Sequence, residues 1–474
     1  MFGTVTGTMP SPALDGGGPA GRFAALRQRY EPRLGSLRGS DTAKAAGLAG
    51  AMIVNNVIAL GSTVVFARLL SDYGSLAALI SYFLILSVAG QAIQVATARE
   101  GVLGHLGVGA GLTATLKRWT RSMAIFTAVL TVISILLRGP IAGAVGVKSD
   151  QWAAAIGLPA GCLWLELSIL RGALQGVGDY KTVGLSLIGE QAVRLVAGAV
   201  LAAAGLGVTG AYLGTPISFI AMGLYCSYEL RRYVVHSETG VAPSTVRKAT
   251  IELWTHVRRA WAPIAGLIVI ALLQNIDIIA AKHRFNGVTD LASSYAATAV
   301  AAKVLIWVAM GAGFYLVPET SRRRAAGEDT RPVLARALAI ILVCAVPVLL
   351  IFAFGATPLL RAAFGANRLK ATSSLLILGV AFTALAGTYL AIQYMLALKR
   401  TWFLVLLAGV AIAEPVLLLQ ASRRPAGFAA VVLGVQAVGA LVAFALALRP
   451  ERGAPVRGAP ERRAGREPAG LETA

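Results

Sequence analysis

Long apolar stretches separated by short polar segments dominate the chain. About a dozen of them approach the roughly 20 residues that a helix needs to cross ~30 Å of hydrocarbon. Because a helix satisfies its own backbone hydrogen bonds in lipid, the pattern predicts an all-α integral membrane protein. We expect twelve spans, at residues 45–67, 75–98, 122–137, 152–170, 182–204, 207–229, 262–281, 292–316, 337–354, 371–396, 402–420 and 426–448.

The longest connection between spans, residues 230–261, is basic and follows span six. It divides the chain into two six-helix halves, residues 45–229 and 262–448, flanked by basic tails at 1–44 and 449–474 that we expect to be disordered. "FARLLSDYGSLAAL" (66–79) and "AAKHRFNGVTDLASSYAAT" (280–298) close corresponding hairpins, which indicates duplication. Repeated six-helix halves are typical of transporters, with substrate handled between them.

Composition and charge place this bundle in a bilayer and orient it. The chain is 57% hydrophobic and only 14% charged, whereas soluble domains carry about a quarter charged residues. Loops on the amino-terminal side hold 31 Lys and Arg residues against 10 on the other side, so both termini are expected in the cytoplasm. This bias also accounts for the net charge of +21 without a nucleic-acid partner. Arginine outnumbers lysine 34 to 9, which hints at a GC-rich bacterium and thus a bacterial plasma membrane.

The sequence argues against an enzyme. The four histidines lie far apart, the predicted outer loops are short, and no loop gathers the carboxylates that acid, base or metal chemistry needs. No GxxxxGK[ST] phosphate loop occurs, so the chain is not by itself a nucleotide-driven pump. Cys162, Cys226 and Cys344 lie within apolar runs without metal-ligand spacing. We therefore expect neither a cofactor nor a metal.

Four segments carry a resemblance to a known family: "ARLLSDYGSLAALISYFLILSV", "RGALQGVGDYKTVGLSLIGEQAVRLVAG", "NIDIIAAKHRF" and "SSYAATAVAAKVLIW". Over roughly residues 45–448 the chain resembles the polysaccharide-biosynthesis flippases of the multidrug/oligosaccharidyl-lipid/polysaccharide exporter superfamily. The resemblance implies two pseudo-symmetric six-helix bundles around a central cavity that opens alternately to either side. It implies a polyprenyl-diphosphate-linked saccharide as cargo. Twelve spans instead of fourteen set the chain apart from peptidoglycan-precursor flippases, whose extra helix pair forms a lipid groove.

Ionisable residues inside spans are candidate sites, because each costs some kcal/mol, about 2.5 to 3.5 on insertion scales. In span five, Glu190 and Arg194 are four residues apart and face the same way. Either they neutralise each other, or Arg194 faces the cavity and contacts a diphosphate. In span two, Gln91 is a candidate ligand contact or an interhelical hydrogen-bonding group. Arg99, at the inner end of that span, is a candidate cavity entrance or a topological anchor.

Span eight contains Lys303 near its centre, without an acid within four residues on its own helix. It either faces the cavity as an anion-binding group or pairs with Asp277 of span seven. Asp277 has two further interpretations: a carboxylate snorkelling to the outer surface, or a ligand of a coupling cation. Gln274 shares its helix face and is a candidate substrate contact. Glu414 precedes Pro415 in span eleven, where freed carbonyls could join the carboxylate in holding a cation.

These residues predict a flippase that moves an anionic, lipid-linked saccharide outward for cell-surface polysaccharide biosynthesis. The diphosphate would pair with Lys303 and Arg194 while the halves rock. Asp277, Glu190 and Glu414 would gate the movement or couple it to an ion. Expected partners are membrane lipids and polysaccharide-assembly proteins. The alternative is a multidrug or cation antiporter of the same superfamily, which would favour acidic over basic groups at the centre.

Overall fold

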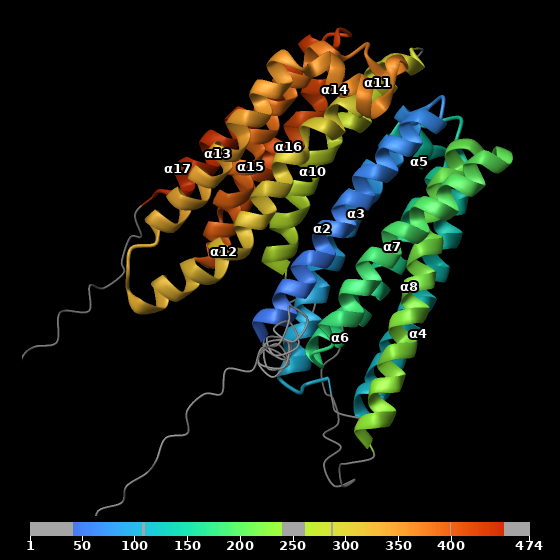
Figure 1. Cartoon of the computed structure of the whole chain (residues 1–474), viewed down its shortest axis with the longest axis vertical. Helices are drawn as coiled ribbons and strands as arrows, with labels where there is room; N and C mark the ends of the chain where they lie inside the picture. The colour runs from blue at the N-terminus through green and yellow to red at the C-terminus, as the bar shows by residue number, and fades with distance from the viewer. Residues whose placement is uncertain (1–40, 107–109, 239–260, 286–287, 399, 450–474) are drawn as a thin grey trace, which may run out of the picture.

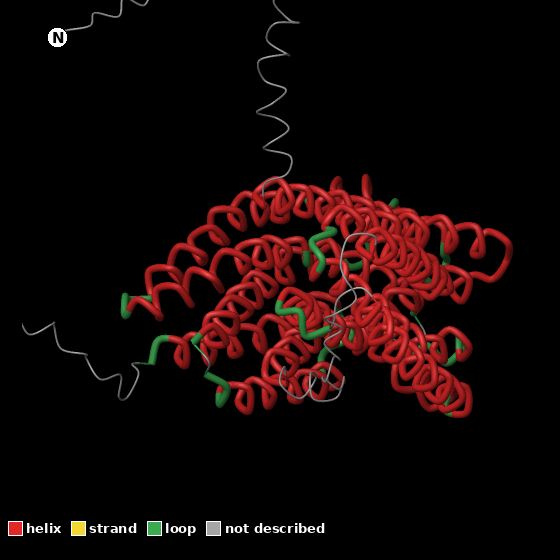
Figure 2. Tube along the Cα trace, turned by 90° about the horizontal axis from the view of Figure 1, so that it is seen from below, coloured by secondary structure: helices red, strands yellow, loops and turns green. Residues whose placement is uncertain are grey.

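The computed structural model describes residues 41–106, 110–238, 261–285, 288–398 and 400–449. The predicted tails and the predicted linker lie mostly outside these residues. The described chain consists of helices joined by short connections, and no strand occurs in it (Figure 2). The all-α prediction is confirmed.

The amino-terminal half contains α2 (Asp41–Leu69), α3 (Tyr73–Val102), α4 (Ala110–Leu136), α5 (Arg138–Val145), α6 (Gln151–Gly176), α7 (Tyr180–Leu201) and α8 (Gly207–Glu238). The carboxy-terminal half contains α10 (Trp261–Arg284), α11 (Thr289–Ala302), α12 (Val304–Ala326), α13 (Arg331–Phe354), α14 (Ala356–Phe364), α15 (Leu375–Ala397), α16 (Phe403–Gln420) and α17 (Pro425–Ala447). Figure 1 shows them as two groups of helices, blue to green and yellow to red.

Eleven helical stretches in the described chain are long and apolar enough to cross a membrane. One of them, Tyr180–Tyr233, contains both α7 and α8. Gly205 (φ 99°) and Gly207 (φ 53°) have positive φ values that reverse the chain between these helices. A Cβ added to Gly214 would lie 2.5 Å from the carbonyl oxygen of Arg194, so the helices pack antiparallel and closely. The described helices therefore correspond to the twelve predicted spans.

Helix boundaries differ from the prediction at several places; the third predicted span, for example, begins at Ala110 in α4 instead of at residue 122. Span eight is broken at Lys303, which ends α11 and begins α12. Span four continues as α6 to Gly176, so it includes Arg171, which we had expected in a loop. The short helices α5 and α14 follow the third crossing of each half and were not predicted, because they are too short to show as apolar runs.

The two halves repeat the same packing. In the first, α3 packs on α6, α4 on α6, α2 on α7, α6 on α8 and α7 on α8. In the second, α12 packs on α15, α13 on α15, α10 on α16, α15 on α17 and α16 on α17. Each pair occupies the same position in its half, since α11 and α12 together form the second crossing. This correspondence confirms the predicted pseudo-symmetry.

The halves meet mainly through α3 and α10, with α11 also against α3 and α14 against α2. Hydrogen bonds join them at the end that carries α5, α11 and α14 (Figure 1). There the Lys282 ammonium contacts both carboxylate oxygens of Asp72, at 2.7 and 2.8 Å. The Gly74 amide donates to Ser293 Oγ at 2.9 Å. We call this the closed end; the charge bias of the loops predicts that it faces outward.

Candidate functional site

A buried cluster of charges lies at the centre of the amino-terminal half. Arg171 of α6 donates from Nη1 to Glu190 Oε2 of α7 at 2.9 Å. Arg194, one turn further along α7, donates from Nη2 to Glu190 Oε1 at 2.5 Å. Arg171 also donates to the hydroxyl and the carbonyl oxygen of Ser186, at 2.9 and 2.8 Å. We call Arg171, Glu190 and Arg194 the arginine cluster.

The arginine cluster carries a formal charge of +1, because two guanidinium groups share one carboxylate. The Arg171 side chain is 0% exposed, whereas that of Arg194 is 19% exposed. Among the described residues, Arg194 Nε is a buried donor without a hydrogen-bond partner. Arg171 is therefore a fully satisfied structural cation, and Arg194 retains capacity to bind an anion.

Aromatic rings surround the arginine cluster. The Arg171 guanidinium lies 5.6 Å from the ring centroid of Trp164, and the Arg194 guanidinium lies 5.3 Å from that of Phe219. Trp164, Phe219 and Phe83 contact one another, with centroids 5.4 to 6.4 Å apart. These rings exclude water from one side of both cations and attract them through their faces.

The carboxy-terminal half contains a second buried cluster with a different balance of charge. Lys303 Nζ donates to Asp277 Oδ1 at 3.0 Å. Glu414 of α16 accepts at Oε1 from Gln436 Nε2 of α17 at 3.0 Å, and Gln436 also donates to the Leu273 carbonyl oxygen at 2.9 Å. Glu414 is 0% exposed, and its Oε2 has no partner among the described residues. We call Asp277, Lys303, Glu414 and Gln436 the acid cluster.

The structure decides between several sequence interpretations. Glu190 and Arg194 do form the predicted pair, but the pair is shared with Arg171. Of the two interpretations of Lys303, the structure shows the pair with Asp277. Lys303 is buried in this pair and is not an open anion-binding group. Snorkelling of Asp277 to the outer surface is wrong, because its side chain is completely buried.

The remaining candidates are not gathered into either cluster. Gln91 and Arg99 are exposed on α3, and Gln274 is half-buried on α10. Next to Gln274, Asn275 donates to the Ala271 carbonyl oxygen of its own helix. Within the described residues, no group of three or more His, Cys, Asp or Glu side chains is placed to hold a metal ion.

Sequence reasoning missed Arg171 and Gln436. Arg171 was assigned to a loop because a prediction from hydropathy ends a span before a charged residue. Arg171 and Glu190 are 19 residues apart, so their spacing does not indicate a pair on one helix. Gln436 lies in an otherwise apolar helix and is buried beside Glu414. An uncharged amide in the middle of α17 was the available signal.

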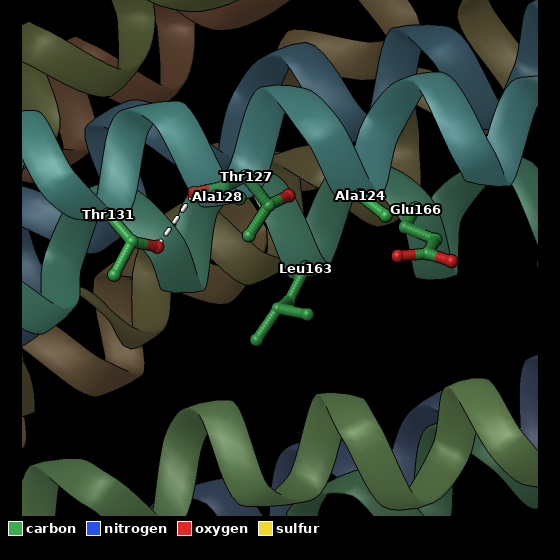
Figure 3. Close-up of a pocket in the computed structure, with 6 residues that line it drawn as sticks. All are labelled: Ala124, Thr127, Ala128, Thr131, Leu163 and Glu166. Carbon is green, nitrogen blue, oxygen red and sulfur yellow. Dashed lines mark hydrogen bonds between the residues drawn. The ribbon is translucent and has the colours of Figure 1, made fainter.

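A groove of about 450 Å³ between α4 and α6 holds another intramembrane carboxylate. Glu166 of α6 lines it together with Leu163, Thr127 and Thr131 (Figure 3). Thr131 donates to the Thr127 carbonyl oxygen at 2.7 Å, which leaves its hydroxyl tied to its own helix. The groove is separate from both clusters.

No protein-family model matches the sequence, and no curated protein matches it. Solved structures do match, and they show that the chain has the fold found in a MATE family transporter and in a lipid II flippase.

The inward-facing conformation of a multidrug resistance MATE family transporter is 14% identical, with a TM-score of 0.62 over 85% of this chain and 97% of that one. Lipid II flippase MurJ in an inward closed conformation is 15% identical, with a TM-score of 0.63 over 84% and 87%. The Vibrio cholerae MATE transporter VcmN is 16% identical, with a TM-score of 0.57 over 86% and 96%. These neighbours are transporters and a flippase, not enzymes, and at such identities they establish the fold alone.

Proposed function

We propose that this protein is a flippase that moves a polyprenyl-diphosphate-linked saccharide from the cytoplasmic to the outer leaflet by alternating access. The arginine cluster is the observation that carries this proposal. A transporter for cations would need acidic groups at an accessible site, whereas the partly exposed ionic group of the arginine cluster is Arg194. An arginine presents a planar fork of donors that suits phosphate oxygens.

We assign the contact with the diphosphate to Arg194 and not to Lys303. Lys303 is neutralised by Asp277 and buried, so binding an anion there would first require breaking that pair. Arg194 needs no such step, because Glu190 remains balanced by Arg171 when Arg194 turns towards a ligand. Gln91, Arg99 and Gln274 lie on α3 and α10, the two helices through which the halves meet, and we assign them to the path of the headgroup.

The acid cluster is proposed as the coupling site. Glu414 has a completely buried carboxyl oxygen without a partner, a costly arrangement for a charged carboxylate. We infer that Glu414 carries a proton in the arrangement described above, in which Lys303 is paired with Asp277. Release of that proton would leave two acids beside Lys303, and the ammonium could then move from Asp277 towards Glu414. Lys303 stands at the joint between α11 and α12, so this exchange would change the angle of span eight.

The second candidate is a cation antiporter of the same superfamily, and the acid cluster favours it. With Asp277 and Glu414 ionised, the acid cluster has a formal charge of −1, which would attract a cation. The two candidates therefore place cargo in different halves. For the flippase the cargo contact is Arg194, and for the antiporter it is Asp277 or Glu414.

Mass spectrometry of co-purifying lipids tests the proposal without presuming a substrate. The wild-type protein, Arg194→Gln and a matched control, Arg336→Gln on the exposed face of α13, are purified from the same host and shown to be monodisperse. We expect a diphosphate-linked saccharide with the wild type and the control that is depleted in Arg194→Gln. The same phospholipids in all three samples would contradict the flippase. Uptake of a cationic dye into proteoliposomes, lost in Glu414→Gln, would then support the antiporter.

A further inference from the structure

At the closed end, a buried arginine of one half binds the end of a helix of the other. Arg368 follows α14 and is 5% exposed. Its Nε donates to the Ala67 carbonyl oxygen at 3.2 Å, and its Nη2 donates to those of Leu70 and Ser71 at 2.5 and 3.1 Å. The last carbonyls of a helix have no partners within it and lie at the negative end of its dipole. Arg368 therefore caps α2 across the interface.

Arg68 makes the reciprocal contact. It is in the last turn of α2 and donates to the carbonyl oxygens of Ala362 and Ala363, at the end of α14. Each half thus contributes an arginine that caps a helix of the other. Together the two arginines donate to five carbonyl groups across the closed end.

The carbonyls accept hydrogen bonds from Nε and Nη2 of Arg368 but do not neutralise its charge. The two nearest acids are already paired: Asp72 with Lys282, and Asp290 with Lys370 at 2.9 Å. Burial lowers the pKa of the Arg368 guanidinium from its ordinary value, while Asp290 and Asp72 oppose that shift. Four cations and two acids give this region a formal charge of +2; they are Arg68, Lys282, Arg368 and Lys370 against Asp72 and Asp290.

A pocket of about 680 Å³ opens beside the buried guanidinium. Ser71, Asp290 and residues 366–370, which include Arg368 and Lys370, line it. Arg368 Nη1 takes part in none of the bonds to α2. The pocket therefore combines a guanidinium with spare donor capacity, an ammonium and a net positive surrounding.

We propose that this Arg368 pocket binds a phosphate-type anion, with diphosphate as the best fit to two adjacent cations. Charge-assisted bonds from a guanidinium to phosphate oxygens are shorter and about twice as strong as neutral ones. Bound diphosphate therefore competes with the α2 carbonyls for Arg368. Binding draws Arg368 off α2, removes its cap and loosens the closed end.

This site goes beyond the proposed function. A lipid diphosphate leaving on this side would be a natural ligand, but a soluble phosphate compound would bind by the same chemistry. The test uses inorganic pyrophosphate and the purified full-length protein in phosphatidylcholine nanodiscs, and it does not depend on flipping. If pyrophosphate does not bind, the proposal for Arg194 still stands. If the lipid analysis finds no diphosphate-linked saccharide, the proposal for this pocket still stands.

Calorimetric titration with pyrophosphate at constant ionic strength measures the site directly. We expect binding to the wild type, loss of binding in Arg368→Ala and retention in Arg361→Ala, an exposed arginine on α14. Asp290→Asn removes the acid that competes for Lys370 and should bind pyrophosphate several-fold more tightly, a gain that misfolding cannot produce. Equal affinity in the wild type, Arg368→Ala and Asp290→Asn would overturn the proposal.

Opening is followed by maleimide labelling of Ser293→Cys, in a background with Cys344→Ser. Ser293 is completely buried against Gly74, so a thiol there reacts when the closed end separates. Pyrophosphate should raise the labelling rate at least about fivefold, the lower end of ordinary coupling between sites. The same rate with and without saturating pyrophosphate would overturn the release of the cap. Tighter binding of farnesyl diphosphate than of pyrophosphate would identify a lipid headgroup as the ligand, and equal binding a soluble anion.

Discussion

The two halves have the same helix packing but different clusters of buried charged groups. In the first, two arginines share one glutamate between the fourth and fifth crossings. In the second, an aspartate of the first crossing holds a lysine, and a second acid lies on the fifth. The formal charges are +1 and −1 when all groups are ionised. This duplicated fold therefore keeps its packing while its two halves hold different sets of buried charges.

Glu190→Gln should have the largest effect, because it leaves two guanidinium groups without their carboxylate. We expect the free energy of unfolding to fall by roughly 3–5 kcal/mol, as for other broken buried ion pairs. Chemical unfolding in detergent measures it. Glu328→Gln is the control, since Glu328 is half exposed and 3.9 Å from Arg323, and should cost less than about 1 kcal/mol. Equal losses in both variants would show that the arginine cluster does not depend on its acid.

Asp277→Asn applies the same test to the other half. It leaves one buried cation instead of two, so we expect a loss of roughly 3 kcal/mol, somewhat smaller than for Glu190→Gln. The double variant Asp277→Leu, Lys303→Met should be much more stable than Asp277→Asn, because apolar groups of similar size can replace a buried ion pair. A double variant as unstable as Asp277→Asn would contradict the ion-pair interpretation.

Arg194→Gln separates binding from packing within the arginine cluster. Arg171 still balances Glu190, so the stability should fall by only about 1 kcal/mol. Lipid recovery should fall roughly tenfold, equivalent to the loss of one charge-assisted bond. Arg171→Gln should show the reverse, a marked loss of stability in thermal unfolding. Identical behaviour of the two variants would mean that the arginines have the same role.

Glu414→Gln should have the smallest effect on stability, below about 1 kcal/mol, because the amide resembles a protonated carboxyl group. The substitution should instead change the coupling of transport to protons. Transport by the wild type should vary with pH, and transport by Glu414→Gln should not. Gln436→Leu, which removes the donor to Glu414 Oε1, serves as the companion variant and should alter the profile without abolishing it. An unchanged pH profile in Glu414→Gln would exclude Glu414 as the coupling group.

The sequence predicted the fold well because each crossing has its own apolar signal. It also placed Glu190 with Arg194 and offered Asp277 as a partner for Lys303. It did not predict the sharing of Glu190 with Arg171, because the apolar signal ended span four before Arg171. It did not predict the contact of Glu414 with Gln436, because a single amide in an apolar helix does not indicate its partner. The Arg368 cap left still less signal. Its acceptors are backbone carbonyls some 300 residues away, and a carbonyl has no sequence signature.

Because of the reciprocal caps, opening of the closed end is coupled to hydration of its backbone. When Arg68 and Arg368 withdraw, five carbonyl groups lose protein donors and can be satisfied only by water. Separation at this end therefore takes up solvent, and excluded osmolytes, which favour burial of protein surface, would hold it shut. In hydrocarbon the same carbonyls would have no replacement partner, so a latch of this kind works only where the membrane surface meets water.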